Sequence, residues 1–433
     1  MTRQKVRYAV GNKYRKVPYK LAQTTKTGNK KKIHDWRLYV EVFGANKRKV
    51  KNVSFNFGGF LYPSSTDCCL PVPIRKPNGG LSWSFSSQRK SYAPVNADVC
   101  ILFADGSKIT IPHRVACRPG GSRSAVQTFA PFVKIPSEQC YGIELELTTM
   151  TDTVRLWELV HGNDANEIFR GWKIKPDNSI ACSISQPDCN TFELVSPKLS
   201  GENGLCQIRS VLNALRQNNI DIKVNKSMGF HVHVEVAKLT QDQLNKICQN
   251  FVKYEDVFDS FLPSSRRSGS KESDRYFKSN RDHIGYLSNR ERLQALEQCH
   301  DILSLASLMN PGRDRYFKLN LQNLVTKRQP TLEFRQHSAT ANFSKVANWI
   351  RLCVLLVRSS ANSPPPKPFS MDRSLEFQTY CLFKDVVKDL ALKDYYLQRQ
   401  QEIHKESRCS CDGCHDGDYC NQTVLKNMRR NKS

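Results

Sequence analysis

The sequence predicts an α+β domain that follows a small all-β module. Residues 36–115 contain short apolar runs separated by turn signals such as Pro77-Asn78-Gly79-Gly80, without a helical period, which is typical of a β-sandwich. Beyond Cys140, strand patterns and long helical patterns follow one another without a regular strand–helix–strand rhythm, which favours an antiparallel sheet with helices. The chain has 433 residues, enough for two or three domains.

Basic residues dominate the beginning of the chain. The formal net charge is +26, and residues 1–53 hold sixteen basic and two acidic residues. Because residues 1–33 also lack periodic apolar side chains, we expect a flexible basic arm there that contacts a polyanion, such as nucleic acid or an acidic protein. No long apolar run is present, so we expect no signal peptide, no membrane contact, and a location in the cytoplasm or the nucleus.

The remaining parts follow in order along the chain. We expect the β-sandwich over residues 34–117, a linker over 118–138, the α+β domain over 139–360, a Pro-rich break with a helical tail over 361–406, and a cysteine-rich basic tail over 407–433. In the α+β domain, strands are predicted at Tyr141–Thr149, Trp172–Lys175, Thr191–Val195, Phe230–Val236 and Thr331–Gln336, and helices at Ile208–Asn218, Gln241–Leu262, Glu291–Met309 and Ser344–Arg358.

Cysteine is abundant, with sixteen residues in the chain. Without a secretory signal, we expect reduced thiols rather than a disulfide framework. Four thiols gather in the last part of the chain, at Cys409, Cys411, Cys414 and Cys420, where zinc is the natural occupant. A second well-spaced Cys-x-x-Cys pair is missing, so a disordered cysteine-rich tail is the alternative.

Three predicted strands each carry two polar residues, two positions apart, between apolar neighbours. These pairs are Glu144 and Glu146, His231 and His233, and Glu333 and Arg335. Residues i and i+2 of a strand point to the same face. A solvated face usually mixes Lys, Thr and Ser, whereas these residues are all metal ligands or phosphate binders. Together with Glu193, which also lies between apolar residues, they favour one shared polar site over independent wetted surfaces.

The residue types indicate which ligands such a site binds. Several carboxylates with one or two imidazoles favour Mg²⁺ or Mn²⁺, and a structural zinc site would require cysteine. Arg335 lies two residues from Glu333 and suits a phosphate that bridges to the metal, with Arg315 upstream as a further cation. The sequence contains no P-loop motif. We therefore predict a metal–nucleotide site on an antiparallel sheet.

Six segments in order carry a family resemblance. They are Tyr-Gly-Ile-Glu-Leu-Glu (141–146), Trp-Lys-Ile-Lys-Pro-Asp-Asn-Ser-Ile (172–180), Phe-Glu-Leu-Val-Ser-Pro (192–197), Gly-Phe-His-Val-His-Val (229–234), Arg-Tyr-Phe-Lys-Leu-Asn-Leu-Gln-Asn-Leu (315–324) and Thr-Leu-Glu-Phe-Arg-Gln-His-Ser-Ala-Thr (331–340). With them, residues from about 140 to 350 resemble the amidoligase family, the carboxylate–amine ligases related to glutamine synthetase and glutamate–cysteine ligase. One departure is Ala339, where the family leads us to expect glycine.

This resemblance implies a glutamine synthetase/glutamate–cysteine ligase-like catalytic domain that uses ATP to join a carboxylate to an amine through an acyl phosphate. It implies that Glu144, Glu146 and Glu193 ligate one metal ion, and that His231 and Glu333 hold the metal that bridges the ATP phosphates. It also implies that His233, Arg335 and Arg315 contact phosphoryl oxygens. Asp177 and Asn320 are further candidates for positioning a substrate, with a turn aspartate and a capping asparagine as the alternatives.

The strand-rich part shows a second, fainter similarity. Residues 36–113 are similar to the YEATS domain, an immunoglobulin-like acyl-lysine reader. The histidine–proline element of that domain is replaced by Gly59-Phe60-Leu61-Tyr62-Pro63. We therefore expect an ordinary immunoglobulin-like accessory module.

Two other functions stay open at this point. One is a basic nucleic-acid or chromatin-binding protein with a non-catalytic ligase fold, and the clustered carboxylates argue against it. The other is phosphoryl transfer to a small amine or guanidine, which a similar site could perform. The acyl donor and the amine are each a small molecule, a peptide or a protein, and the basic N-terminal part favours a peptide or protein substrate.

Overall fold

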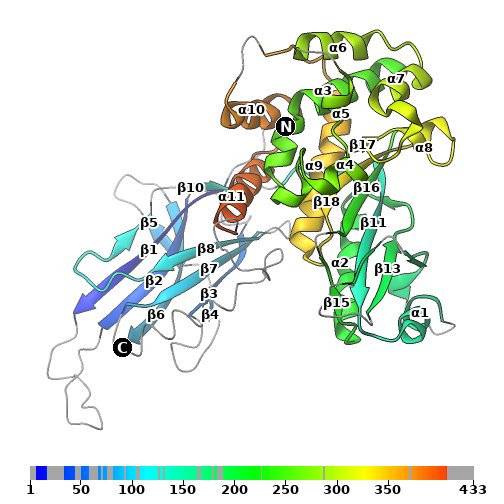
Figure 1. The fold of residues 1–433 in the computed structure, drawn as a ribbon. Coiled ribbons are helices and arrows are strands. Elements are labelled where there is room, and N and C mark those ends of the chain that lie inside the picture. Colours follow the sequence, from blue (N-terminus) through cyan, green and yellow to red (C-terminus); the bar gives the residue numbers. More distant parts are fainter. Residues whose placement is uncertain are drawn as a thin grey trace. The chain divides into compact units, whose positions relative to one another are not determined.

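The computed structural model divides the chain into two compact units, Met1–Phe132 and Val133–Ser433. The residues that the structure describes are 6–16, 34–43, 50–57, 67–69, 72–75, 81–91, 94–103, 108–124, 127–129, 132–162, 167–177, 180–182, 189–225, 227–285, 288–369 and 373–406. Each unit has its own sheets (Figure 1).

The first unit contains two antiparallel sheets. Their strand orders are β10-β1-β2-β6-β5, with β9 paired to β1, and β4-β3-β7-β8. The strands are β1 (Val6–Lys16), β2 (His34–Phe43), β3 (Val50–Asn56), β4 (Asp67–Cys69), β5 (Val72–Arg75), β6 (Leu81–Ser91), β7 (Asn96–Phe103), β8 (Lys108–Arg114), β9 (Ser122–Arg123) and β10 (Gln127–Phe129). Alternate side chains from both sheets, including Trp36, Leu38, Phe55 and Val99, share one buried core. The short alternating runs therefore do form strands.

The boundaries predicted for this part are wrong at both ends. Residues 6–16, expected in a flexible arm, form β1, which pairs along its length with β2. The buried side chains of Val6, Tyr8 and Val10 alternate with residues on the opposite face, and the basic residues there hid this strand period. The expected linker over 118–138 also contains β9 and β10, which both pair with β1.

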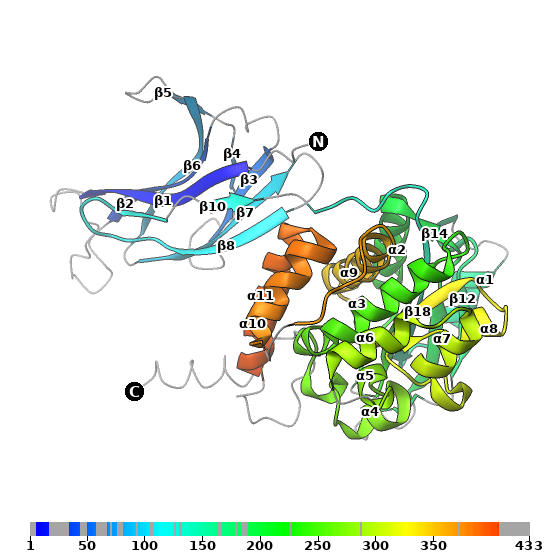
Figure 2. The same cartoon turned by 90° about the horizontal axis from the view of Figure 1, so that it is seen from above.

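The second unit is built on an antiparallel sheet with the strand order β12-β13-β11-β16-β18-β17 (Figures 1 and 2). These strands are β11 (Cys140–Thr149), β12 (Lys173–Pro176), β13 (Asn190–Val195), β16 (Gly229–Glu235), β17 (Leu319–Asn320) and β18 (Thr331–Ser338), and β14 (Leu199–Ser200) and β15 (Ile222–Lys223) pair with β11. The combination of antiparallel sheets and helices confirms the α+β class.

Helices cover one face of this sheet. On that face, Phe334 of β18 contacts Phe251 of α3 (Gln241–Ser260), and the hydroxyl of Tyr141 in β11 donates to the carbonyl of Gly201 in α2 (Gly201–Gln217). The other long helix is α9 (Phe343–Ala361), and shorter helices are α1 (Thr153–His161), α4 (Lys271–Tyr276), α5 (Asn280–His283) and α8 (Gln322–Val325). The opposite face of the sheet is left for polar side chains.

Helix caps explain where the helical predictions succeed and where they differ. Thr240 caps α3 in a capping box with Gln243, as its position before the apolar period predicts. The single helix predicted over Glu291–Met309 is two helices, α6 (Asn289–Glu297) and α7 (Ile302–Met309), because Asp301 starts a new helix with its own cap.

The helical tail belongs to the second unit rather than to a separate part. It consists of α10 (Leu375–Cys381), a π-helical segment (Leu382–Val387) and α11 (Leu390–Glu406). Tyr396 of α11 stacks on Phe261, with ring centroids 4.3 Å apart. Asp389 accepts a hydrogen bond of 2.5 Å from the backbone of Val133, at the start of the unit. Burial of these apolar and polar groups fixes the tail to the helices.

Three further expectations concern cysteines, basic residues and membranes. Cys409, Cys411, Cys414 and Cys420, as well as the run 30–32, lie outside the described residues. Cys182 and Cys189 form a disulfide, so the expectation of reduced thiols is wrong for this pair. None of the helices in the described part of the chain has the length and apolar character needed to cross a bilayer.

Candidate active site

The register of the sheet brings the predicted carboxylates and imidazoles together. Glu144 lies opposite His231, Glu146 lies opposite Glu193, and His233 lies opposite Glu333. Directly opposed side chains on neighbouring strands are about 5 Å apart. All these side chains therefore converge on one face, opposite to the face covered by helices.

Two imidazoles stand at the centre of the cluster. His231 Nδ1 lies 3.5 Å from Glu144 Oε2 and 3.6 Å from Glu333 Oε1, and His231 Nε2 lies 3.8 Å from Glu146 Oε1. His233 Nε2 lies 3.4 Å from Glu144 Oε1 and 3.9 Å from Glu333 Oε1. Two overlapping sets of residues could each hold a metal ion: Glu144, His233 and Glu333, and Glu144, Glu193 and His231. Within each set, one ligand atom per residue lies within 4.8 Å of the others.

The cluster fits a divalent cation. His231 Nδ1 and His233 Nε2 are buried and have no hydrogen-bond partner among the residues that the structure describes. Both atoms face carboxylate oxygens across distances that are too long for strong hydrogen bonds. A donor set of carboxylate oxygens and imidazole nitrogens suits Mg²⁺ or Mn²⁺.

Two carboxylates of the cluster, Glu144 and Glu193, have pKa values that are shifted in opposite directions. Burial raises the pKa of Glu144, but the imidazoles of His231 and His233 outweigh burial and hold that pKa well below its usual range. Burial, followed by the charge of Glu144, raises the pKa of Glu193 to about 8. A cation at the cluster would therefore compete with a proton on Glu193.

Glu333 accepts hydrogen bonds from three side chains, those of Arg335, Asn320 and Asn323. Arg335 Nη1 lies 2.5 Å from Glu333 Oε1, and Asn320 Nδ2 donates to Glu333 Oε2 at 2.7 Å. Burial raises the pKa of Glu333, but the charges of Arg335, His233 and His231 together outweigh burial and lower the pKa. Asn320 Oδ1 also accepts a hydrogen bond from the backbone N–H of Gln322 at 2.8 Å. Asn320 therefore both orients Glu333 and caps the turn that follows.

The two predicted phosphate-binding arginines share one aromatic neighbour. The guanidinium carbon of Arg335 lies 5.5 Å from the ring centroid of Tyr316, and that of Arg315 lies 5.0 Å from it. Arg315 is exposed and donates to the Tyr316 hydroxyl at 3.1 Å, whereas Arg335 is buried. Arg335 thus lies beside Glu333, whereas Arg315 is linked to the cluster through the charges of Glu333 and Glu144, which contribute, after the hydrogen bond to Tyr316, to its raised pKa.

Asp177, the other candidate for positioning a substrate, lies directly after β12. Its carbonyl accepts a hydrogen bond from Thr191 in β13, and its charge contributes to the raised pKa of Glu193. Its carboxylate therefore acts on the edge of the cluster.

Sequence reasoning missed the role of Gly229, the first residue of β16. Its N–H donates to Glu146 Oε2 at 2.5 Å, and a Cβ atom there would lie 2.7 Å from His231 Nε2. Glycine is therefore required by the close approach of the imidazole. The Gly-Phe-His-Val-His spacing is the signal that could have indicated this.

Lys318, three residues after Arg315, lies on the helix side of the sheet. It is fully buried and pairs with Glu255 Oε1 at 2.9 Å and with Asp259 Oδ1 at 2.7 Å. Both carboxylates belong to α3, on the helix side of the sheet. Lys318 therefore links the sheet to α3 and does not face the cluster.

A cavity of about 330 Å³ adjoins the cluster. Glu144 and His233 form part of its wall, together with Gly142, Val195 and Ser196. Such a cavity can hold part of a substrate next to the predicted metal ligands.

A family model described as "Putative amidoligase enzyme" matches residues 137–357, about half of the chain. The chain belongs to this family. The amidoligase region contains all eight residues predicted for the metal–nucleotide site: Glu144, Glu146, Glu193, His231, His233, Arg315, Glu333 and Arg335. The match confirms the resemblance of the six segments, whereas the roles of the individual residues stay predictions.

Two further comparisons add little to the amidoligase assignment. No curated protein matches the chain. Among solved structures, the crystal structure of the Yaf9 YEATS domain bound to H3K27ac is similar, with 14% identity and a TM-score of 0.19 over 30% of this chain and 91% of that one. This agrees with the faint similarity seen in the sequence, but a TM-score of that size carries no argument.

Proposed function

We propose that this protein is an ATP-dependent carboxylate–amine ligase that forms an amide or isopeptide bond through an acyl phosphate. One observation carries the proposal. In a member of the amidoligase family, four carboxylates and two imidazoles converge beside a buried arginine on the open face of an antiparallel sheet.

In this proposal, divalent cations are held by the clustered carboxylates and His231. The ligands are Glu144, Glu146, Glu193, His231 and Glu333, and the cation is Mg²⁺ or Mn²⁺. When bound, such a cation supplies positive charge that neutralises the phosphates of ATP. Asn320 and Arg335 hold Glu333 in place from two sides, so this ligand is oriented before a cation arrives.

The remaining cationic groups act on the phosphates. Arg335, His233 and Arg315 would contact phosphoryl oxygens as an oxygen of the substrate carboxylate attacks the γ-phosphorus and ADP leaves. Because charge accumulates on the transferred group, a fixed guanidinium stabilises the transition state more than bound ATP. The amine nitrogen then attacks the acyl carbon, loses a proton and displaces phosphate.

We also propose the finer fold assignments that the sequence indicates. The second unit would have the glutamine synthetase/glutamate–cysteine ligase type of catalytic fold, and the first unit would be an immunoglobulin-like accessory module. A polyanion contact through the basic N-terminal part and zinc at Cys409, Cys411, Cys414 and Cys420 are proposals of the same kind.

Product analysis tests the function. The full-length protein is incubated with ATP, Mg²⁺ and pools of carboxylates and amines, and ADP, phosphate and new amides are measured. A ligase releases ADP and phosphate in step with amide formation. ADP formation with phosphate transferred to an amine or guanidine would instead identify a phosphotransferase, and no ATP turnover with any pool would support a binding protein.

A matched pair of variants links any turnover to the cluster. Glu333→Gln keeps the shape of a buried ligand and removes its charge, so turnover should be lost. Glu376→Gln makes the same change at an exposed position of α10 and should leave turnover unchanged.

A further inference from the structure

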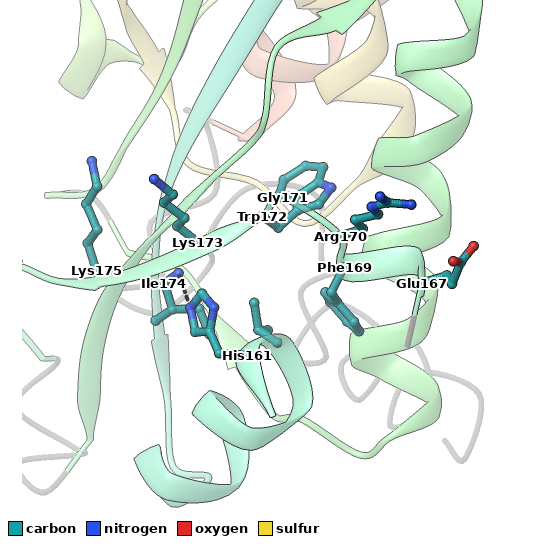
Figure 3. Close-up of a pocket in the computed structure, with 10 residues that line it drawn as sticks. His161, Glu167, Phe169, Arg170, Gly171, Trp172, Lys173, Ile174 and Lys175 are labelled. Carbon is teal, nitrogen blue, oxygen red and sulfur yellow. Dashed lines mark hydrogen bonds between the residues drawn. The ribbon is translucent and has the colours of Figure 1, made fainter. Parts of the chain in front are cut away.

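Two lysines stand at the open edge of the catalytic face. Lys173 and Lys175 are exposed on β12, the edge strand of the sheet. Their side chains point to one side of the strand, whereas Ile174 and His161 lie on the other side (Figure 3). Among the residues that the structure describes, neither lysine forms an ion pair, and the charge of Lys175 acts on Glu193, where it opposes the rise in pKa that burial causes.

The register connects these lysines to the carboxylate cluster. Lys175 lies opposite Glu193, which in turn lies opposite Glu146. Because neighbouring strands are about 4.8 Å apart, the backbone of Lys175 lies about 10 Å from that of Glu146. Both lysines therefore stand on the face that carries the cluster, one strand away from Glu193 and two strands away from Glu144 and Glu146.

The cavity next to the cluster is lined in part by β11 and β13, two of the strands that connect the lysines to the cluster. Lys173 is opposite Val195, which lines the cavity of about 330 Å³, and Val195 is opposite Glu144 in the wall of that cavity. A second hollow, of about 620 Å³, follows the edge strand and is lined by both lysines and by Arg170. His161 and Ile174 also line this hollow, and none of its lining residues lines the smaller cavity, so the connection between the lysines and the cluster rests on the register of β12, β13 and β11.

Charge alternates across this face of the sheet. Cations stand on β12, carboxylates follow on β13 and β11, and Arg335 lies beyond them on β18. In the proposed function Arg335 binds phosphates. The lysines thus form a second group of cations, on the opposite side of the cluster from Arg335.

We propose that Lys173 and Lys175 bind carboxylates of an acidic peptide, and that a further side-chain carboxylate of this peptide is the acyl donor. The inference rests on the proposed ligase function. Residues i and i+2 of a strand are about 6.7 Å apart, which is also the spacing of alternate carboxylates along an extended acidic peptide. Because the cluster lies across the strands from β12, a peptide that engages both lysines along β12 turns across β13 to present a third carboxylate to the cluster, which a small dicarboxylate cannot do.

The peptide would lie over the face rather than add a strand to the sheet. The N–H of Ile174, which points away from β13, donates to His161 Nε2 at 3.2 Å. This hydrogen bond occupies the donor that an added strand would use. The competing explanation is that both lysines only protect the edge strand from pairing with other chains.

Cross-linking locates the peptide without requiring turnover. The full-length protein with Mg²⁺ is mixed with a hexaglutamate peptide and a carbodiimide, which couples carboxylates to adjacent lysines, and the conjugated lysines are mapped by mass spectrometry. We expect more conjugate at Lys173 and Lys175 than at Lys367, an exposed lysine of the Pro-rich segment. Conjugates distributed evenly over exposed lysines would overturn the proposal.

Affinity measurements with a fluorescent hexaglutamate peptide test the same point in solution. The double variant Lys173→Gln/Lys175→Gln should bind about three- to tenfold more weakly at low salt, as expected for the loss of two exposed charge pairs. Lys367→Gln should bind like the unaltered protein. Equal affinities of all three proteins would overturn the proposal, and so would equal competition by glutaric acid and by unlabelled peptide.

The test of the lysine subsite can fail or succeed independently of the test of the ligase function. Conjugation at both lysines in a protein without ATP turnover would support the subsite and contradict the ligase. Turnover with other carboxylates, combined with unselective conjugation, would support the ligase and contradict the subsite.

Discussion

Arg335 Nη1 lies 2.5 Å from Oε1 of Glu333, two residues earlier on β18, and both side chains are buried. Arg335 Nε has no hydrogen-bond partner among the described residues, so the guanidinium keeps donor capacity for a ligand. The same side chain therefore fixes a predicted metal ligand and is available to a phosphate.

Replacing Arg335 separates these two roles. Arg335→Lys keeps a positive charge near Glu333 but loses the planar, two-pronged donor geometry. If the guanidinium stabilises the charge that develops on the transferred phosphoryl group, kcat should fall about a hundredfold or more. The KM for ATP should change much less. Steady-state ADP release measures both quantities.

Arg351 provides the matched control for this prediction. On α9, its Nη1 and Nη2 each lie 2.6 Å from an oxygen of Glu202, a purely structural pairing. Arg351→Lys should lower the melting temperature and leave kcat unchanged. If Arg335→Lys shows this same pattern, the phosphate role of Arg335 is wrong.

Gly229 gives a test of the metal site that does not depend on turnover. A Cβ atom at this position would lie 2.7 Å from His231 Nε2 and 3.5 Å from Glu146 Oε1. Gly229→Ala should therefore displace the imidazole and weaken Mn²⁺ binding about tenfold or more, as a shifted ligand does. Isothermal titration calorimetry with Mn²⁺ measures the change.

Gly142 is the matched control, because it also lies on the cluster face of the sheet. The nearest atom to a Cβ at Gly142 would be Ser196 Oγ at 3.6 Å, an ordinary contact. Gly142→Ala should bind Mn²⁺ as the unaltered protein does. Equal losses in both variants would show that general disturbance of the sheet, and not the imidazole position, causes the effect.

The raised pKa of Glu193 predicts how the stability of the metal-free protein depends on pH. Burial and the charge of Glu144 raise this pKa from its usual 4.5 to about 8. Between these values the folded state holds a proton that the unfolded state has released, so stability falls as pH rises from about 4.5 to about 8. Glu193→Gln should remove this contribution. The melting temperature of the variant, relative to the unaltered protein in a chelator, should therefore increase with pH across that window.

Addition of a metal ion should oppose the fall in stability that the metal-free protein shows as pH rises. A bound cation favours ionised Glu193, so Mg²⁺ should stabilise the unaltered protein more at pH 8 than at pH 5. Glu376→Gln, at an exposed position, should show no such pH-dependent difference. A Glu193→Gln curve parallel to that of the unaltered protein at every pH would contradict the prediction.

The strand period explains why much of the site could be predicted from the sequence. Glu144 and Glu146 had to share a face once they lay in a strand, and the same holds for His231 and His233. The order of the strands could not be predicted in the same way. That β16 lies between β11 and β18 depends on pairings between segments almost a hundred residues apart, for which the sequence holds no local signal.

Residues outside the alternating pairs show where the strand period does not predict the environment of a side chain. Lys318 precedes the two-residue strand β17, which is too short for a period to indicate a face. The strand β1 was missed because its exposed basic residues resemble those of a disordered arm. In both cases tertiary packing decides whether the residues are buried and ordered. Composition alone would predict an exposed lysine and a disordered segment.

The buried Lys318 yields the last prediction. Its Nζ donates to Glu255 at 2.9 Å, to Asp259 at 2.7 Å and to Ser268 Oγ at 2.6 Å, and the side chain is fully buried. Lys318→Met retains the apolar stem but leaves two buried carboxylates without a cation. Breaking a buried pair in this way costs about 3–5 kcal/mol. Urea denaturation at pH 7.5 should show this loss in the free energy of unfolding.

The pH dependence of the loss distinguishes charge from packing. Burial already raises the pKa of Asp259, and Lys318 opposes that rise. Without the lysine the pKa rises further, so acid neutralises the stranded carboxylate in the folded state and the loss should be smaller at pH 4.5 than at pH 7.5. A packing defect would cost the same at both values. Lys367→Met, at an exposed position, should change stability little at either pH, and a pH-independent loss in Lys318→Met would refute the electrostatic explanation.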